Sequence, residues 1–351
     1  MTIGEAQELA PIQPFRRRKK RLRPKESPNR GEQKIKLTCP PRRLSMAAHC
    51  AALILFHYAE SFLRKSDLNR TSLPCRFGRR EFLIIAAPVV VMIAPLYFLI
   101  ERILTSIHNG ATALIQGLSL GLLSNEALER LTEYRYSKQS APYADEQYLN
   151  SGLFLWEREA IRRYFPQGGR ILVAAAGAGR ELIALTNCGF VVDGFDCCAP
   201  LIESGRKELS KHGIAAKLNY APPSTVPKCC GDHDAVLVGF SGYMYIPGRS
   251  RRIRFLRDLR DFLRPGAPVM VSFTEGLPGR RRIWTARIGS AIRKLRRAEP
   301  VEQGDWLKDG FQHHFDRQQI ESEMSEAGID LMYYGGGTCY GHAVGLVRSS
   351  M

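Results

Sequence analysis

The stretch ILVAAAGAGRELIALTNCGFVVDGFD, residues 171–196, decides the predicted fold of this chain. It reads as an apolar strand, a glycine turn, a helix and a second apolar strand that ends in an acid. Gly177 and Gly179 keep the turn free of side chains, so a ligand can press against the backbone where the strand passes into the helix. The start of that helix offers unpaired N–H groups and a partial positive charge. Asp196 ends the second strand, where its carboxylate can accept hydrogen bonds from both hydroxyls of a ribose. The stretch therefore predicts a pocket for a nucleotide-type cofactor.

The residue at the third glycine position of the dinucleotide-binding fingerprint distinguishes dinucleotide cofactors from other nucleotide-type cofactors. Nicotinamide and flavin cofactors need a small residue there for close helix packing, and this chain has Leu182. The stretch resembles instead motif I of class I S-adenosylmethionine-dependent methyltransferases, with Ala175 where that family usually has its first glycine. The resemblance implies S-adenosyl-L-methionine as the cofactor, and contacts to it from Ala175, Gly177, Gly179, Asp196, Cys197 and Phe240.

The resemblance continues over roughly residues 150 to 350. DAVLVG, residues 234–239, fits a buried parallel strand, and residues 249–273 fit a helix, a Pro-Gly stop and another strand. The segments 315–334 and 339–347 resemble the last helix, the Ala-Gly turn and the final strand pair of the family. The implied fold class is α/β, a doubly wound Rossmann-like seven-stranded sheet with a terminal antiparallel hairpin, preceded by a disordered basic arm and an apolar helix.

Four segments follow from this pattern. Residues 1–80 are predicted to be the basic, disordered arm, and 81–105 an apolar segment that is transmembrane or membrane-associated. Residues 106–150 are predicted to be a helical linker or lid, and 151–351 the methyltransferase domain. One expected adenine contact has no match, because family members commonly carry an acid after the third strand. Residues 215–227, AAKLNYAPPSTVP, offer only Asn219 or a backbone carbonyl for that contact.

The basic charge is concentrated at the amino terminus. Residues 1–80 hold 19 of the 51 Lys and Arg residues but only 6 of the 34 Asp and Glu residues. A nucleic-acid enzyme is expected to carry such charge on its folded part, so a nucleic-acid partner is disfavoured. The arm is a solvated tail, or it attracts anionic lipid or nucleic acid.

Phe82 to Ile100 form 19 uncharged, almost wholly apolar positions. At about 1.5 Å per residue this length matches a bilayer core of about 30 Å, so a membrane span is predicted, with a buried or surface-lying segment as the alternative. A single crossing with the Arg-rich side inside would export the catalytic domain from its cofactor supply. We therefore expect a membrane-associated protein with a cytoplasmic catalytic domain. The nine cysteines include no Cys-x-x-Cys pair, which favours reduced thiols and no metal site.

Candidate catalytic residues lie in loops after the strands. Tyr243 and its neighbour Tyr245 follow the fourth strand and are suited to orient an acceptor, while His313 and His314 are candidate general bases near neutral pH. Each of these residues also has an ordinary packing role as its alternative. The same holds for a predicted lid that includes Tyr148, Ser151, Gly152 and Trp156. The basic stretch at residues 277–300 is a lid over an acidic substrate, a membrane-facing helix or a solvated amphipathic helix.

Together with the apolar segment, the resemblance favours a membrane-associated methyltransferase acting on a small-molecule or lipid-like acceptor. Two alternatives stay open. One is a nucleic-acid or protein methyltransferase recruited by the basic arm, although no Asn/Asp-Pro-Pro-Tyr motif follows the fourth strand as in enzymes that methylate amino groups of DNA bases. The other is a non-catalytic module that kept the fold. The acceptor, the attacked atom and the oligomeric state do not follow from the sequence.

Overall fold

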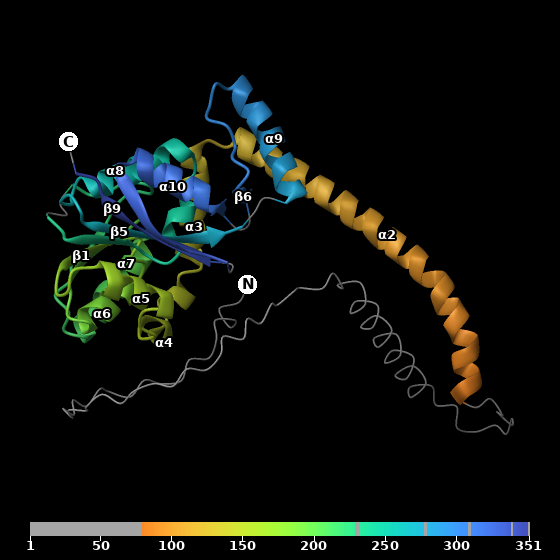
Figure 1. Ribbon diagram of the computed structural model, residues 1–351, viewed down its shortest axis with the longest axis horizontal. Coiled ribbons are helices and arrows are strands. Elements are labelled where there is room, and N and C mark those ends of the chain that lie inside the picture. The colour runs from red at the N-terminus through yellow and green to blue at the C-terminus, as the bar shows by residue number, and fades with distance from the viewer. Residues whose placement is uncertain (1–78, 229–231, 277–278, 308–309, 338–339, 350–351) are drawn as a thin grey trace, which may run out of the picture. The chain divides into compact units, whose positions relative to one another are not determined.

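The computed structural model describes residues 79–228, 232–276, 279–307, 310–337 and 340–349, and the side chains from residue 95 onward (Figure 1). The chain divides into two compact units, residues 1–81 and 82–351. The predicted arm of residues 1–80 lies outside the described residues, except for the start of a helix at Arg79.

The described part of the second unit is built on one mostly parallel sheet. Its strands run in the order β3-β2-β1-β4-β5, and β9 and then β8 extend it beyond β5 in the antiparallel sense. The strands are β1 (Arg170–Ala174), β2 (Val191–Asp196), β3 (Leu218–Tyr220), β4 (Ala235–Val238), β5 (Pro268–Glu275), β8 (Ile329–Gly335) and β9 (Tyr340–Val347). Between β1 and β4 the chain order reverses, which is the point where doubly wound sheets bind their ligands. The predicted doubly wound sheet with a terminal antiparallel hairpin is confirmed, but in the described residues it has nine strands and not the predicted seven.

A second hairpin was not predicted. Strands β6 (Asp305–Leu307) and β7 (Phe311–Phe315) pair with each other, and β7 pairs in parallel with the last two residues of β5. Along β7 buried residues alternate with half-buried ones, so Phe311, His313 and Phe315 face inward. The hairpin brings the predicted catalytic histidines to the carboxyl end of β5.

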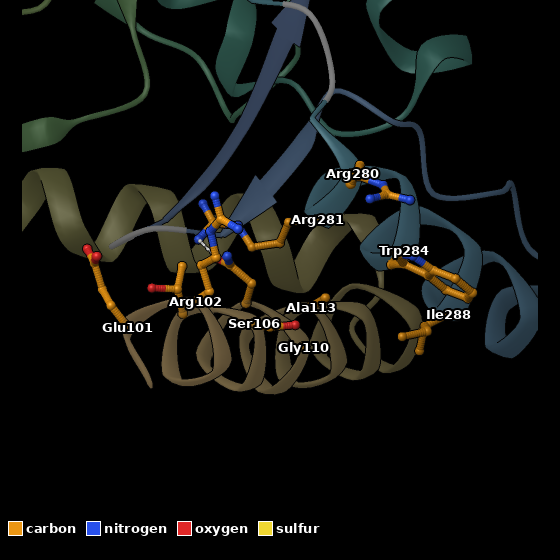
Figure 2. A pocket seen from close by; sticks show the side chains of 11 residues that line it. Glu101, Arg102, Ser106, Gly110, Ala113, Arg280, Arg281, Trp284 and Ile288 are labelled. Carbon is orange, nitrogen blue, oxygen red and sulfur yellow. Dashed lines mark hydrogen bonds between the residues drawn. The ribbon is translucent and has the colours of Figure 1, made fainter. Parts of the chain in front are cut away.

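Helices cover both faces of the sheet. They are α3 (Asn125–Lys138), α4 (Glu146–Leu149), α5 (Leu155–Tyr164), α6 (Arg180–Asn187), α7 (Ala199–Lys211), α8 (Arg249–Arg260) and α10 (Arg317–Glu326), with short 3₁₀ turns η2 (Ala141–Tyr143) and η3 (Gly242–Tyr245). Two longer helices, α2 (Arg79–Leu122) and α9 (Arg280–Leu295), lie against each other beside this layered core (Figures 1 and 2).

Two glycines allow the close approach of α2 and α9. A Cβ on Gly117 would lie 2.7 Å from the Cβ of Ile288, and one on Gly121 would lie 2.8 Å from the Cβ of Ile292. The two glycines are four residues apart and share one face of α2. Isoleucine side chains of α9 therefore fill the space that the missing side chains leave, and α9 is fixed on the carboxyl-terminal half of α2.

The predicted transmembrane helix needs correction. Phe82–Ile100 belongs to α2, and its side chains up to residue 94 lie outside the described set. Among the described residues, no helix combines the length and the apolar character that a bilayer crossing requires.

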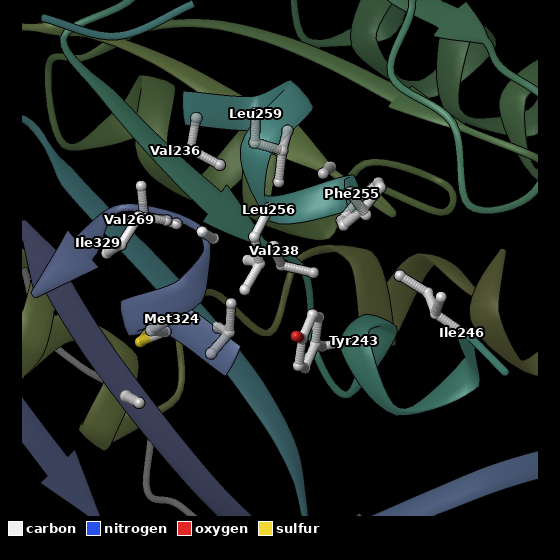
Figure 3. Close-up of a cluster of buried hydrophobic side chains, with 14 of the residues drawn as sticks. Val236, Val238, Tyr243, Ile246, Phe255, Leu256, Leu259, Val269, Met324 and Ile329 are labelled. Carbon is white, nitrogen blue, oxygen red and sulfur yellow. The ribbon is translucent and has the colours of Figure 1, made fainter. Parts of the chain in front are cut away.

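The core has two layers that follow the alternation of the strands. Leu172 and Val236 face one layer, formed with α8 and α10. Figure 3 shows Val236 in this layer with Leu256 and Met324. The intervening residues face the other layer, where α5, α6 and α7 pack. Strands covered on both sides need apolar residues at nearly every position, which explains why the runs of β1 and β4 are continuously apolar.

Candidate functional site

The turn after β1 adopts a left-handed backbone at three positions. The φ angles are +52° at Ala175, +53° at Gly177 and +93° at Gly179, which caps the start of α6. A Cβ on Gly177 would meet no atom closer than the Cδ1 of Leu201, at 4.0 Å. The backbone at Gly177 therefore has no tight side-chain contact, as a cofactor that presses against this turn requires.

The turn after β4 closes over the same place. A Cβ on Gly239 would lie 2.5 Å from the carbonyl oxygen of Ala175, and one on Gly242 would lie 2.6 Å from its Cβ. The two turns thus touch through backbone and a single methyl group. This contact fixes Phe240, between those glycines, beside the glycine turn.

Asp196 joins the ends of β1 and β2. Its carboxylate accepts hydrogen bonds from the backbone N–H of Gly177 at 2.8 Å and of Cys198 at 2.7 Å. Burial raises the pKa of Asp196, and the backbone N–H groups of Cys198, Gly177 and Cys197 oppose that rise. A carboxylate has about four lone-pair positions, so with these three N–H groups about one remains for a hydroxyl donor. The predicted role of Asp196 toward a ribose fits this geometry, and the same side chain also holds the glycine turn.

The six predicted cofactor residues come together at the carboxyl ends of β1, β2 and β4. Cys197 follows Asp196 and is half-buried, and burial raises the pKa of its thiol, which keeps it neutral. Phe240 is tied to the start of α6, because its N–H donates to the Glu181 carboxylate at 3.2 Å. Asn219, the candidate for adenine, lies half-buried on β3 next to β2. Its role stays a prediction.

A buried ion network lies at the start of α6 and was missed by the sequence reasoning. Arg180 is 1% exposed and pairs with Glu157 at 2.8 Å and with Glu181 at 2.7 Å. It also donates to the carbonyl of Gly152 at 2.7 Å, and its guanidinium lies over the ring of Phe154 at 4.2 Å. The network therefore ties the predicted lid to the helix that follows the glycine turn. The acid at Glu157 was the available signal, since a buried arginine requires such partners.

An aromatic wall borders the site on the β5 and β9 side. The ring of Phe240 contacts Phe154 at 5.1 Å and Tyr340 at 5.0 Å between centroids. Trp156 packs on His342 at 4.6 Å and reaches Phe240 at 6.4 Å. Trp156 was predicted to border the site, whereas Phe154, Tyr340 and His342 were not. These rings offer an apolar surface beside the cofactor turn.

Tyrosines border the site on the lid side. Tyr136 of α3 contacts Tyr245 at 5.3 Å and Tyr143 at 5.4 Å, and Tyr143 contacts Tyr148 at 6.2 Å. Burial raises the pKa of Tyr245 to about 12, so its hydroxyl keeps its proton. Tyr245 lies in the loop after β4, where the sequence predicts a tyrosine that faces the acceptor.

Tyr243 lies elsewhere, and the structure does not support its predicted catalytic role. It is 1% exposed, and its hydroxyl donates to Glu323 of α10 at 2.6 Å. Arg252 pairs with the same carboxylate at 2.6 Å. Residues 242–245 form a 3₁₀ turn, in which successive side chains point about 120° apart. Tyr243 consequently points into the core while Tyr245 points to the lid.

The two histidines also differ from the prediction of a base active near neutral pH. His313 is fully buried, with its Nδ1 2.7 Å from Asp305, and burial lowers its pKa to about 4. His314 is half-buried, its Nε2 lies 3.4 Å from Arg282, and its pKa is also lowered to about 4, first by burial and then by the charge of Arg282. Neither matches the ordinary pKa of histidine, and His313 has no access to an acceptor.

Oxygen and nitrogen atoms of Glu302, Asp305 and His313 lie within 4.8 Å of one another. Arg252 binds both carboxylate oxygens of Glu302, at 2.8 and 2.9 Å. The guanidinium therefore already supplies the positive charge that these acids need.

Comparison with known proteins gives structural likeness only. No protein-family model and no curated protein sequence matches the chain. Among solved structures, it is similar to an S-adenosylmethionine-dependent methyltransferase from Methanosarcina mazei, at 16% identity and TM-score 0.45, over 57% of this chain and 100% of that one. A 1,6-didemethyltoxoflavin-N1-methyltransferase from Burkholderia thailandensis, solved with bound 1,6-didemethyltoxoflavin and S-adenosylhomocysteine, shares 13% identity at TM-score 0.47, over 65% and 92% of the two chains. A sugar N-methyltransferase from Streptoalloteichus shares 14% identity at TM-score 0.42, over 55% and 86%.

Proposed function

We propose that this chain is an S-adenosylmethionine-dependent methyltransferase that acts on a small-molecule acceptor, lipid-like compounds included. One observation carries the proposal, namely the left-handed turn at Ala175, Gly177 and Gly179 with Asp196 bonded to it at the reversal point of the sheet. A Cβ at Gly177 would meet only one atom within 4 Å, so the turn has no tight side-chain contact there, and Asp196 keeps about one lone pair for a ribose hydroxyl. The residues present fit the cofactor.

The chain's own residues then have defined tasks. S-adenosylmethionine supplies the activated methyl group, so the protein has mainly to align the acceptor with it and exclude water. The turn and Asp196 bind and orient the cofactor. Phe240, Trp156 and Tyr340 border the place where an apolar acceptor would lie. Because Tyr245 keeps its proton, it serves as a hydrogen-bond donor there and not as a base.

Calorimetric titration with S-adenosylmethionine tests the cofactor. We expect micromolar binding by the wild-type chain and a loss of at least tenfold in Asp196→Asn, because an amide cannot accept at both positions that face backbone N–H groups. Asp261→Asn removes the same charge from an exposed position at the end of α8 and should bind like the wild type.

The absence of binding at millimolar cofactor would favour the non-catalytic alternative. Equal binding by Asp196→Asn would remove Asp196 from the cofactor site. If the wild-type chain binds the cofactor, incubation of metabolite and lipid extracts with radiolabelled methyl donor would identify the acceptor class.

A further inference from the structure

A groove between α2 and α9 lies outside the site described above. It encloses about 820 Å³ and is lined by residues 101–113 of α2 and by the first turns of α9. Figure 2 shows Arg281 extending from α9 across this groove toward α2, and the guanidinium lies 3.4 Å from the Oδ1 of Asn109. Both helices are fixed by their glycine contacts, so the groove is a defined feature of the fold.

The lining carries an excess of positive charge. Arg102, Arg280 and Arg281 border the groove, and Glu101 is the one carboxylate among the lining residues. Across the described ranges, no carboxylate forms an ion pair with Arg280, Arg281 or Arg282. The cationic side of the groove therefore lacks the protein counter-charge that the buried Arg180 and Arg252 have.

The arginines are held in place although they repel one another. Arg281 and Arg282 both stack on Trp306, with the guanidinium carbon 4.4 and 5.3 Å from the ring centroid. Burial, and then the charge of Arg281, lower the pKa of Arg282. Stacking orients a guanidinium and leaves its N–H groups available for an anion. Arg280 and Arg281, which line the groove, and the neighbouring Arg282 stand in the first turn of the 16-residue helix α9, whose partial positive charge adds to theirs.

The remaining surface of the groove is apolar. Trp284 and Ile288 of α9 line it, and Trp284 is 57% exposed. Ser106 and Asn109 add hydrogen-bonding groups from α2. An anionic group at the arginines would thus leave an attached chain or ring in contact with Trp284.

We propose that this groove binds a small molecule that carries a phosphate or carboxylate group on an apolar chain or ring. Fork-shaped arginine donors match the oxygens of either group, and the indole surface covers the apolar part. The proposal concerns binding and does not depend on methyl transfer.

The proposal is tested by titrating the full chain with octyl phosphate, octanoate, inorganic phosphate and octanol. Calorimetry and tryptophan fluorescence measure the binding of each compound. We expect octyl phosphate and octanoate to bind at least tenfold more tightly than inorganic phosphate or octanol. The double variant Arg102→Gln/Arg281→Gln should lose at least tenfold in affinity for octyl phosphate. Arg158→Gln, which removes one charge from an exposed position on α5, should bind like the wild type.

Trp284→Ala tests the apolar half separately and leaves every arginine in place. It should weaken octyl phosphate binding severalfold and leave the binding of inorganic phosphate unchanged, with circular dichroism confirming the fold of each variant. The proposal is overturned if the double variant keeps its affinity, if Arg158→Gln loses as much, or if inorganic phosphate binds as tightly as octyl phosphate. Preference of octyl phosphate over octanoate would assign the group as phosphate, and the reverse order as carboxylate.

Discussion

The methyl group of Ala175 occupies the space that Gly242 leaves open at the start of η3. A Cβ on Gly242 would lie 2.6 Å from the Cβ of Ala175, whereas ordinary carbon contacts are about 3.5–4.0 Å. The two residues follow β1 and β4, which are neighbours in the sheet. The alanine in the cofactor turn is therefore matched by a glycine in the turn beside it.

This relationship predicts a coupled pair of substitutions. Gly242→Ala should lower the free energy of unfolding by about 1–3 kcal/mol, because a second methyl group overpacks the contact. Ala175→Gly should change stability little, since it removes the contact but also relieves a left-handed alanine that costs about 1–2 kcal/mol. In the double variant the glycine at 175 makes room for the alanine at 242, and most of the loss should be recovered.

Urea denaturation of the four proteins gives the coupling energy, which we expect to exceed about 1 kcal/mol. Gly110→Ala serves as a control in α2, where a Cβ would meet nothing within 4 Å. Strictly additive effects would show that the two positions do not share this space.

The Arg180 network predicts a large effect from a residue on the lid. Glu157→Ala removes a carboxylate that accepts two hydrogen bonds from Arg180, at 2.8 and 3.0 Å. Because the guanidinium stays buried with fewer partners, the free energy of unfolding should fall by about 3 kcal/mol. Glu159→Ala, at an exposed position of the same helix, should cost less than about 0.5 kcal/mol. Chemical denaturation compares the two, and equal losses would mean that Arg180 finds other partners.

The strands that hold the site could be predicted because each is encoded by a short apolar run in the local sequence. Apolar runs bounded by turns indicated β1, β2, β4 and β5, and the position of Asp196 at the end of β2 followed from chain spacing alone. Side-chain direction inside a short turn depends on contacts distant in sequence. Glu323, eighty residues beyond Tyr243, decides that this tyrosine points inward, and no local pattern contains that information.

Which charged side chains are buried could not be predicted from the sequence either. Arginine is almost never fully buried unless paired, so Arg180 reads as an ordinary surface residue until Glu157 is placed beside it by the fold. The β6–β7 hairpin is short and alternates apolar with polar residues, and its two strands together span only eleven positions. It gave too weak a pattern to predict, although it determines the surroundings of both candidate histidines.

Tyr243→Phe separates a structural from a catalytic role. The variant leaves the buried Glu323 carboxylate without one donor, so the free energy of unfolding should fall by about 1–3 kcal/mol. Cofactor affinity should stay within about twofold of the wild type, since the side chain faces the core. Thermal unfolding and calorimetric titration measure the two quantities. A tenfold loss of cofactor affinity at unchanged stability would return Tyr243 to the site.

Acid should destabilise the fold through its histidines. The pKa of His314 is about 4 in the folded chain against an ordinary 6.5, so the unfolded chain binds a proton first as the pH falls. Stability from this group is therefore present above pH 6.5 and is lost as the pH falls toward 4. His313 acts in the same direction. Asp305 acts oppositely, because burial raises its pKa to about 6 and the folded chain then takes up its proton first.

His314→Gln isolates the half-buried member of this set. Its loss of unfolding free energy between pH 7 and pH 5 should be smaller than that of the wild type by roughly 1 kcal/mol, with allowance for solvent screening at this position. Urea denaturation at the two pH values measures the difference. His108→Gln, at an exposed position of α2, should keep the pH dependence of the wild type. If His314→Gln keeps it as well, the proton taken up on unfolding belongs to another group, and the contact between His314 and Arg282 does not persist in solution.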